Sequence, residues 1–295
     1  MAAQNMPAAE IDIDDGLVRR LLADQHPDLA ALPLTLAANG WDNAIFRLGA
    51  ELAVRVPRRQ LGADLIANEH RWLPELASRL PIPVPVPLRV GLPSDDYPWS
   101  WTVVAWFDGD VAADVTLTDP MVEARRLGRF VDALHTPAPA DAPVNPFHRG
   151  QPIAELHSRV VNSIERLGDS IDAGAVAARL DRLTDVADWH EAPVWVHGDL
   201  HSANVVVRDG MISAVIDFGD ITSGDPAVDL AIGWMLFDDA ALESFRASAG
   251  AIDDATWSRA QAWALHFALL YLLHSADAPR FRRMGTHLLQ RVVAS

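Results

Sequence analysis

The chain has 295 residues, half of them hydrophobic, and a formal net charge of −16. It contains no Cys, which excludes disulfides, thiolate nucleophiles and Cys-ligated zinc. The acidic balance argues against nucleic acid as a partner, because contact with phosphates requires a basic surface. It favours a cationic partner instead, since an acidic cleft concentrates cations. An acidic surface that only aids solubility is the alternative.

The N-terminal stretch does not resemble a signal peptide, because it has neither a basic start nor an apolar run. No apolar stretch reaches the length of about 18 residues that a membrane span requires. We therefore expect a cytoplasmic protein without a membrane partner. The length suits one large domain or two lobes. All 24 residues counted as Lys or Arg are Arg.

Residues 1–107 have the pattern of a small lobe rich in strands. Apolar residues at helical spacing predict a first helix over 15–26. Alternating residues then predict strands, and Gly49 suits a tight turn between two of them. The Pro-rich stretch at 81–87 excludes a helix there. The predicted strands lie around 44–48, 52–56 and 99–107, and a second helical pattern covers 63–79.

Residues 108–295 have mainly helical patterns, interrupted by short strands and by a Pro- and Ala-rich loop at 135–146. Helices are predicted over 118–135, 153–167, 173–188, 225–237 and 255–274, and strands over 194–196, 204–207 and 211–216. The change of composition predicts two lobes, and a cleft between lobes is a usual place for a ligand.

Ionisable residues gather at the ends of the predicted strands in the stretch VWVHGDLHSANVVVRDGMISAVIDFGD at 194–220. Because the ends of adjacent strands lie close together, we expect Asp199, Asn204 and Asp217 to converge. Their carboxylate and amide oxygens suit Mg²⁺, and an Asp outside the metal site accepts a proton from a hydroxyl. The alternative is a zinc cluster of His197, Asp199 and His201 in a hydrolase, because alternate residues of a strand share a face.

The same stretch resembles a known family. Asp199 and Asn204 have the spacing of the protein-kinase catalytic loop, and a DFG sequence follows at Asp217. Gly198 in place of the kinase Arg, and the IDFGD context, instead resemble the aminoglycoside phosphotransferase family, also called the phosphotransferase enzyme family. The resemblance is strongest over 194–236 and weaker over 36–107.

The resemblance implies a two-lobed α+β fold like that of protein kinases. A small antiparallel-sheet lobe over 1–107 would bind the nucleotide, and a larger, mainly helical lobe over 108–295 would hold the catalytic loop and the acceptor site. Asp199 would be the catalytic base, or would orient the acceptor hydroxyl, and His197 would brace the loop. Asn204 and Asp217 would hold Mg²⁺ at the nucleotide phosphates.

Further roles follow from the same resemblance. His201 would contact the substrate or form a hydrogen bond within the loop. Asp225 and Asp229 would be structural, with Asp229 anchoring the loop.

In the small lobe, the family has a Lys that grips phosphate and pairs with a Glu. This sequence offers Arg55 and Glu69; Arg keeps the charge but differs in geometry. The alternative is that Arg55 is a surface charge. Gly40, in the loop at 39–43, would serve nucleotide positioning or only a turn. The backbone of Ala105 and Phe107 would pair with the edge of the base.

The expected reaction moves the γ-phosphoryl group of ATP or GTP to a hydroxyl of a small molecule. Acidic residues at 236–256, including Asp238 and Asp239, fit a cationic acceptor and make an aminoglycoside the first choice, with antibiotic resistance as the associated role. A solvated helix face is the alternative interpretation of these residues. Trp-rich helices leave a macrolide as an acceptor, and a metabolite kinase or a nucleotide-binding pseudokinase as other functions.

Overall fold

The computed structural model describes residues 7–275 and 277–294. The first six residues, on which the expectation of no signal peptide partly rests, lie outside this part. The chain divides into two compact units. The first contains the described residues up to Arg79, Pro83–Asp108 and Ile216–Gly219, and the second contains Leu80–Ile82, Gly109–Val215 and the described residues from Asp220 onwards. Across the described residues, no helix combines the length and apolarity needed to span a membrane.

The first unit is built on an antiparallel sheet with the strand order β1-β2-β3-β5-β4. Gly49, with φ of 62°, makes the predicted tight turn between β2 and β3, which pair from Leu48 with Leu52 to Asn43 with Pro57. The Pro-rich stretch before β4 is not helical, as predicted. The five strands are Leu34–Asn39, Asn43–Leu48, Leu52–Pro57, Arg89–Gly91 and Trp101–Ala105.

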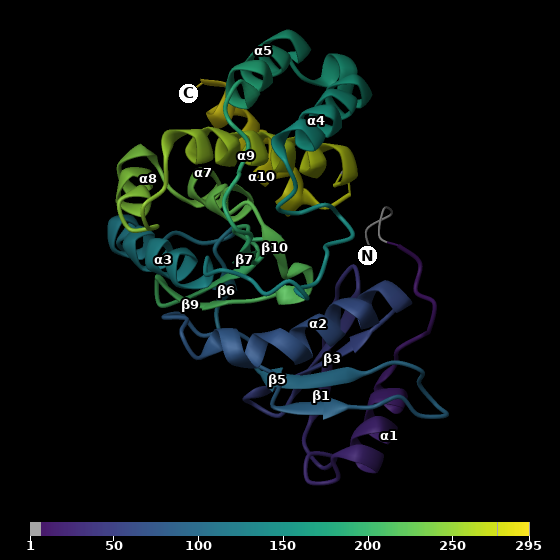
Figure 1. The fold of residues 1–295 in the computed structure, drawn as a ribbon. Coiled ribbons are helices and arrows are strands. Elements are labelled where there is room, and N and C mark those ends of the chain that lie inside the picture. The colour runs from purple at the N-terminus through teal and green to yellow at the C-terminus, as the bar shows by residue number, and fades with distance from the viewer. Residues whose placement is uncertain (1–6, 276, 295) are drawn as a thin grey trace. The chain divides into compact units, whose positions relative to one another are not determined.

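Helices cover both faces of this sheet (Figure 1). Helix α1 (Asp15–Gln25) buries its apolar stripe in a core with Phe46, Val54 and Val56. Because side chains alternate along a strand, Arg55 points to the other face, where α2 (Gln60–Ala77) carries Glu69. The alternation of β3 therefore separates an apolar core from a charged pair.

The second unit contains two small sheets. Strands β6 (Asp110–Val111), β8 (Val205–Arg208) and β9 (Met211–Val215) form one, and β7 (Val194–Val196) and β10 (Thr222–Gly224) form the other. The hairpin of β8 and β9 pairs Val205 with Val215. Asn204 precedes the first of these residues directly, and Asp217 follows the second by two positions.

Most of the second unit is helical. Helix α9 (Asp254–His274) is buried around almost its whole circumference, which marks a central helix rather than a surface one. It packs against α4, α5, α6, α7 and α10, and Figure 1 shows it running through the middle of the yellow-green helices. The other helices are α3 (Pro120–Leu134), α4 (Ile153–Leu167), α5 (Ala173–Thr184), α6 (Ala227–Leu230), α7 (Ile232–Leu236), α8 (Asp239–Arg246) and α10 (Pro279–Ala294), with 3₁₀ turns at Gly168–Ser170 and Phe218–Asp220.

The predicted α+β fold, with a small antiparallel sheet followed by a mainly helical region, is confirmed. The differences lie at the ends of elements and in elements that were not predicted. The helix predicted over 225–237 is divided into α6 and α7. The one predicted over 173–188 ends at Thr184. Helices α8 and α10 were not predicted as separate elements, although each has an apolar face, with Ala241, Leu242 and Phe245 buried in α8 and Leu288 and Val292 buried in α10.

Candidate active site

One buried carboxylate, that of Asp229, anchors the loop between β7 and β8. Asp229 accepts hydrogen bonds from the backbone N–H of His197 at 2.7 Å and of Gly198 at 2.9 Å. The ring of His135 adds a third contact, with Nε2 3.2 Å from the carboxylate. This confirms the prediction that Asp229 anchors the loop. Asp225 is also structural, because it accepts a hydrogen bond from Arg259 Nε at 2.6 Å.

Gly198 explains why this loop lacks the Arg of protein kinases. Its φ is 82°, in the left-handed region that favours glycine. A Cβ atom here would lie 2.5 Å from the backbone oxygen of Asp220. Any side chain at this position would therefore force the loop away from the segment that carries Asp220.

Asp199 presents a carboxylate whose two oxygens lie beside two different nitrogen-bearing side chains, Arg149 and His201. Its Oδ1 accepts a hydrogen bond from Arg149 Nη2 at 3.3 Å, and its Oδ2 lies 3.4 Å from His201 Nε2. Burial alone would raise the pKa of the Asp199 carboxyl, but His201, Arg149 and, more weakly, His197 hold it well below its usual range. The side chain is 25 % exposed. Asp199 is thus an oriented, ionised and accessible hydrogen-bond acceptor.

The two His side chains of the loop hold its own backbone. His197 Nδ1 accepts from the N–H of Asp199 at 3.3 Å, and His201 Nδ1 accepts from the N–H of Ala203 at 3.1 Å. Because Nδ1 of His201 accepts, the neutral ring carries its proton on Nε2, the atom beside Asp199. Both rings are buried, so the loop conformation and the orientation of the carboxylate depend on each other.

Sequence reasoning missed Arg149. It lies in the segment before α4, and no linear motif marks it. Its guanidinium stacks over the ring of Phe267 at 4.7 Å, and Asn145, four residues earlier, donates to the backbone oxygen of Asp220 at 3.0 Å. Only the folding of this segment against the catalytic loop brings the guanidinium to Asp199, so a sequence signal for it does not exist.

Asn204 is turned by a hydrogen bond of its own. Its Nδ2 donates to the backbone oxygen of Asp199 at 3.0 Å. The amide nitrogen is thereby occupied, and the amide oxygen is left as the atom with which Asn204 could hold a cation. Oxygen is the donor that Mg²⁺ prefers.

The charged group of the first unit is centred on Arg55. This residue is 7 % exposed, so the alternative of a surface charge is wrong. Its guanidinium grips Glu69 with two nitrogens, Nη2 donating to Oε1 at 3.0 Å and Nη1 to Oε2. Nη2 also lies 3.5 Å from Asp217 Oδ1. Burial raises the pKa of the Glu69 carboxyl, while Arg55 opposes that shift.

Asp217 differs from Glu69 in being open to solvent. Its side chain is 57 % exposed, and its φ of 66° is unusual for a residue other than glycine. Such backbone strain concentrates at functional sites. The carboxylate therefore has oxygen atoms available to a cation, which fits the proposed magnesium role.

Three other residues predicted to bind the nucleotide lie at turns and strand ends of the first unit. Gly40 closes the hairpin of β1 and β2 through its N–H, which donates to the oxygen of Asn43 at 2.8 Å. Ala105 ends β5 opposite Leu52, and Phe107 follows it by two residues. The turn interpretation of Gly40 accounts for its hydrogen bond.

The acidic residues predicted to bind the acceptor have partners within the protein. Asp238 caps α8, accepting from the N–H of Ala241 at 2.9 Å. Asp239 Oδ1 accepts from Arg291 Nη2 at 3.1 Å. The cap explains Asp238, and the full exposure of Asp239 fits the alternative of a solvated helix face.

Within the part of the chain that the structure describes, no group of three or more His, Cys, Asp or Glu side chains is arranged to hold a metal ion. His197, Asp199 and His201 therefore do not form the cluster that the zinc-hydrolase alternative requires.

Solved structures with the same fold are phosphotransferases. Aminoglycoside 2'-phosphotransferase-IIIa in its GDP complex has a TM-score of 0.71 at 18% identity, over 96% of this chain and 99% of that chain. APH(2")-IIia with GDP and kanamycin has a TM-score of 0.70 at 19% identity, over 94% and 98%. The macrolide 2'-phosphotransferase MphH from Brachybacterium faecium has a TM-score of 0.59 at 23% identity, over 92% and 97%. These likenesses establish the fold.

Among curated proteins, no sequence is significantly similar to this chain. The profile of the phosphotransferase enzyme family matches residues 33–263, which include the β-sheet of the first unit and the whole catalytic loop. This match confirms the family and the enzyme class that the loop motif predicted. The chain belongs to the phosphotransferase enzyme family.

Proposed function

We propose that this protein transfers the γ-phosphoryl group of ATP or GTP to a hydroxyl group of a small molecule. The observation that carries the proposal is the state of Asp199. Its carboxylate is ionised, held at both oxygens and still accessible. Such a group can accept a hydrogen bond from a hydroxyl and align it for attack. The solved structures in complex with GDP and kanamycin support the same reaction class.

We assign nucleotide binding to the first unit and the acceptor to the second. Arg55 would contact the nucleotide phosphates, with Glu69 setting the direction of its guanidinium. The loop at Gly40 and the backbone of Ala105 and Phe107 would bind the rest of the nucleotide. His197 would hold the catalytic loop through its contact with the N–H of Asp199.

Asp199 would act chiefly by orienting the acceptor hydroxyl. A carboxylate with a depressed pKa is a weak base, but phosphoryl transfer passes through a loose transition state that depends on positioning more than on early proton removal. The hydroxyl proton would pass to Asp199 late in the transfer. His201 would steady the second carboxylate oxygen from its distance of 3.4 Å.

The oxygens of Asn204 and Asp217 are the proposed ligands of Mg²⁺, which would neutralise charge on the phosphates when bound. We expect Asp217→Ala to lose magnesium-dependent nucleotide binding. Calorimetry with ATP, with and without magnesium, measures this loss. An unchanged affinity for MgATP would contradict the metal role.

The test of the reaction is release of nucleoside diphosphate from MgATP and MgGTP with pools of aminoglycosides, macrolides and amino alcohols. Release that requires one pool and is absent in Asp199→Asn would establish the transfer. Bound nucleotide without turnover on any pool would instead indicate a pseudokinase, in which Arg55 replaces the family's Lys.

We also propose a cytoplasmic location, where ATP and GTP are available and where a chain without Cys needs no oxidative folding. If the acceptor is an aminoglycoside or a macrolide, expression in a sensitive bacterium should raise the drug concentration that stops growth. The Asp199→Asn variant is the matched control, and equal growth with both proteins would contradict a role in resistance.

A further inference from the structure

A pocket of about 370 Å³ opens in the second unit beside the catalytic loop. Its volume falls in the range of roughly 300–1,000 Å³ that is usual for sites of small ligands. Ser202 of the catalytic loop, three residues after Asp199, forms part of its wall. Tyr271 of α9 forms another part, and its ring meets the ring of His201 edge-on at 5.9 Å.

Tyr271, which lines the pocket, carries a buried hydroxyl. Tyr271 is 8 % exposed, and its hydroxyl finds no hydrogen-bond partner among the described residues. A buried polar group without a partner is costly, so such groups in native proteins usually meet a ligand or an ordered water. Ser202 and Thr116 add two further hydroxyl-bearing side chains to the wall.

The rest of the wall is largely apolar. It comes from the segment before α3, the end of α7 and α10, and it includes Val115, Leu117, Met235, Leu236, Met284 and Leu288. Methionine side chains adapt their shape to a ligand. The pocket can therefore cover a hydrocarbon portion of an acceptor as well as its hydroxyl groups.

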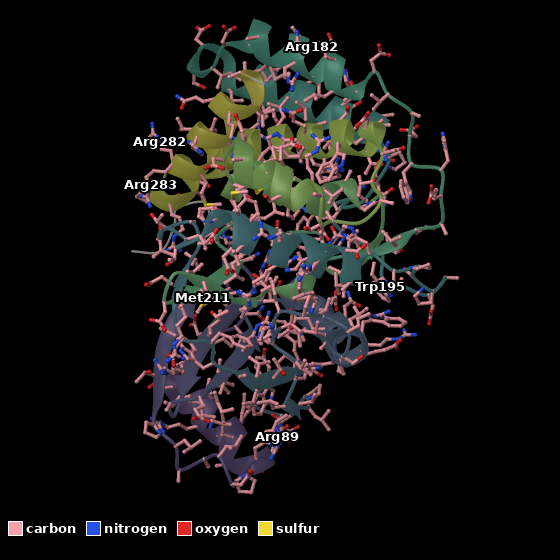
Figure 2. The ribbon with its side chains drawn as sticks, turned by 90° about the vertical axis from the view of Figure 1, so that its left-hand side faces the viewer. Arg89, Arg182, Trp195, Met211, Arg282 and Arg283 are labelled. Atoms are coloured by element: carbon pink, nitrogen blue, oxygen red, sulfur yellow. The ribbon has the colours of Figure 1, made fainter. Side chains whose placement is uncertain are left out.

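The charges on the wall do not favour a polycation. The chain carries a net charge of −16, yet Asp238 is the carboxylate among the described residues that line this pocket, and it caps α8. Arg283 lies on the same wall and donates to Asp114 at 3.1 Å; Figure 2 shows it at the edge of α10 beside Arg282. Beside Asp199 lies the further cation Arg149. Several bound ammonium groups would each need a carboxylate partner.

We infer that this pocket is the acceptor site and that it takes a hydroxylated molecule with an apolar portion and at most one positive charge. The inference rests on the proposed function and narrows its substrate class. It replaces the expectation of a polycationic acceptor, because Asp238 serves as a helix cap and Asp239 pairs with Arg291.

Calorimetry on the protein loaded with MgADP tests the substrate class. The probes are a macrolide, a neutral alkyl glycoside and kanamycin. We expect at least one of the two low-charge compounds to bind more tightly than kanamycin. Its affinity should change by less than about twofold between about 0.05 M and about 0.5 M salt, because screening affects only charged contacts. Tighter binding of kanamycin, or no binding of either low-charge compound, would overturn the inference.

A pair of Met variants tests the location. Met284→Trp fills the pocket, whereas Met211→Trp places the same side chain on β9, where Met211 is 53 % exposed (Figure 2). We expect Met284→Trp to weaken binding of the low-charge acceptor by about tenfold, as overfilling a packed site does. Met211→Trp should change it by less than about twofold. Affinity for MgADP, measured on both variants, shows that each has folded.

Equal acceptor binding by Met284→Trp and the wild type would overturn the location. Failure of the proposed function gives a different result. In that case nucleoside diphosphate release in Asp199→Asn would equal the wild-type release, whichever acceptor binds.

Discussion

Each unit contains a carboxylate that pairs with an Arg side chain, Glu69 in the first unit and Asp199 in the second, and the two differ in their exposure to solvent. Glu69 is fully buried, and both of its oxygens face Arg55. Asp199 also faces an Arg, but one of its oxygens lies beside His201 and the side chain stays 25 % exposed. In the first pair, Arg55 and Glu69 meet each other's hydrogen-bonding needs, and Glu69 fixes the orientation of the Arg55 guanidinium. The second leaves oxygen lone pairs of Asp199 open to solvent. Exposure, more than the type of partner, distinguishes Glu69 from Asp199, the carboxylate that we propose contacts the acceptor hydroxyl.

The largest expected effect on this difference between the two carboxylates comes from changing Asp199. We expect Asp199→Asn to keep nucleotide affinity and to lower transfer by about 100- to 10,000-fold, the usual contribution of a positioned acid or base. An amide cannot accept the proton and presents a donor where the hydroxyl needs an acceptor. Steady-state turnover and calorimetry with MgATP measure the two quantities. Equal turnover in variant and wild type would refute the assignment.

At Glu69 the expected effect is on folding. Glu69→Gln leaves the Arg55 charge buried with a weaker partner, and removing one member of a buried pair costs about 3–5 kcal/mol of unfolding free energy. Denaturant unfolding measures this loss. The matched control is the double variant Arg55→Met with Glu69→Met, which removes both charges and should recover most of the stability while losing nucleotide affinity. A single variant as stable as the wild type would show that the pair is not needed for folding.

Changing Arg149 should lower turnover less than changing Asp199, because Arg149 acts through its contact with the Asp199 carboxylate. Arg149→Gln removes a hydrogen bond to a charged group, so we expect turnover to fall by about 10- to 100-fold, equivalent to about 1.5–3 kcal/mol. Because Arg149 lowers the pKa of Asp199, its loss should move the acid limb of the pH profile to higher pH.

Arg149→Lys is the control, since it keeps the charge and should leave the acid limb of the pH profile near its wild-type position. If the acid limb of the pH profile does not move in Arg149→Gln, then Arg149 does not lower the pKa of Asp199.

The depressed pKa of Asp199 also stabilises the fold at pH values above the ordinary Asp pKa of about 3.9, and this stabilisation is lost as the pH falls.

The smallest effect is expected at Asp238. Asp238→Ala removes the cap of α8 and should lower the unfolding free energy by about 1 kcal/mol. Asp238 also lines the pocket, but its carboxylate serves the helix, so the KM for a low-charge acceptor should change by less than about twofold. Thermal unfolding and acceptor kinetics check both values. A large rise in KM with unchanged stability would show that the Asp238 carboxylate binds the acceptor directly.

Sequence patterns were sufficient to predict a feature where the residues involved are close together in the sequence or belong to a known motif. The strand alternation around Arg55 and the helical spacing that includes Glu69 predicted the two elements that meet at this pair. The spacing from Asp199 to Asn204 predicted the family, and the family implied the anchoring role of Asp229. These features repeat at fixed intervals along the chain, so they can be seen without coordinates.

Other features depend on segments that are far apart in the sequence. Arg149 reaches Asp199 across 50 residues, and the acceptor pocket collects walls from segments between Ala112 and Leu288. The acidic residues at 236–256 were predicted to bind a cation from composition alone, and the structure gives Asp238 and Asp239 partners within the protein. Composition counts charges but does not assign their partners.

The sequence by itself determined the family, the α+β architecture and the loop that carries Asp199, because periodicity and motif spacing are properties of neighbouring residues. The tertiary structure alone decided which carboxylates remain available, which cation lies beside Asp199 and what chemistry lines the pocket. Hydrogen bonds and burial arise between residues that meet only after folding, and these contacts set both the ionisation of a side chain and its access to a ligand.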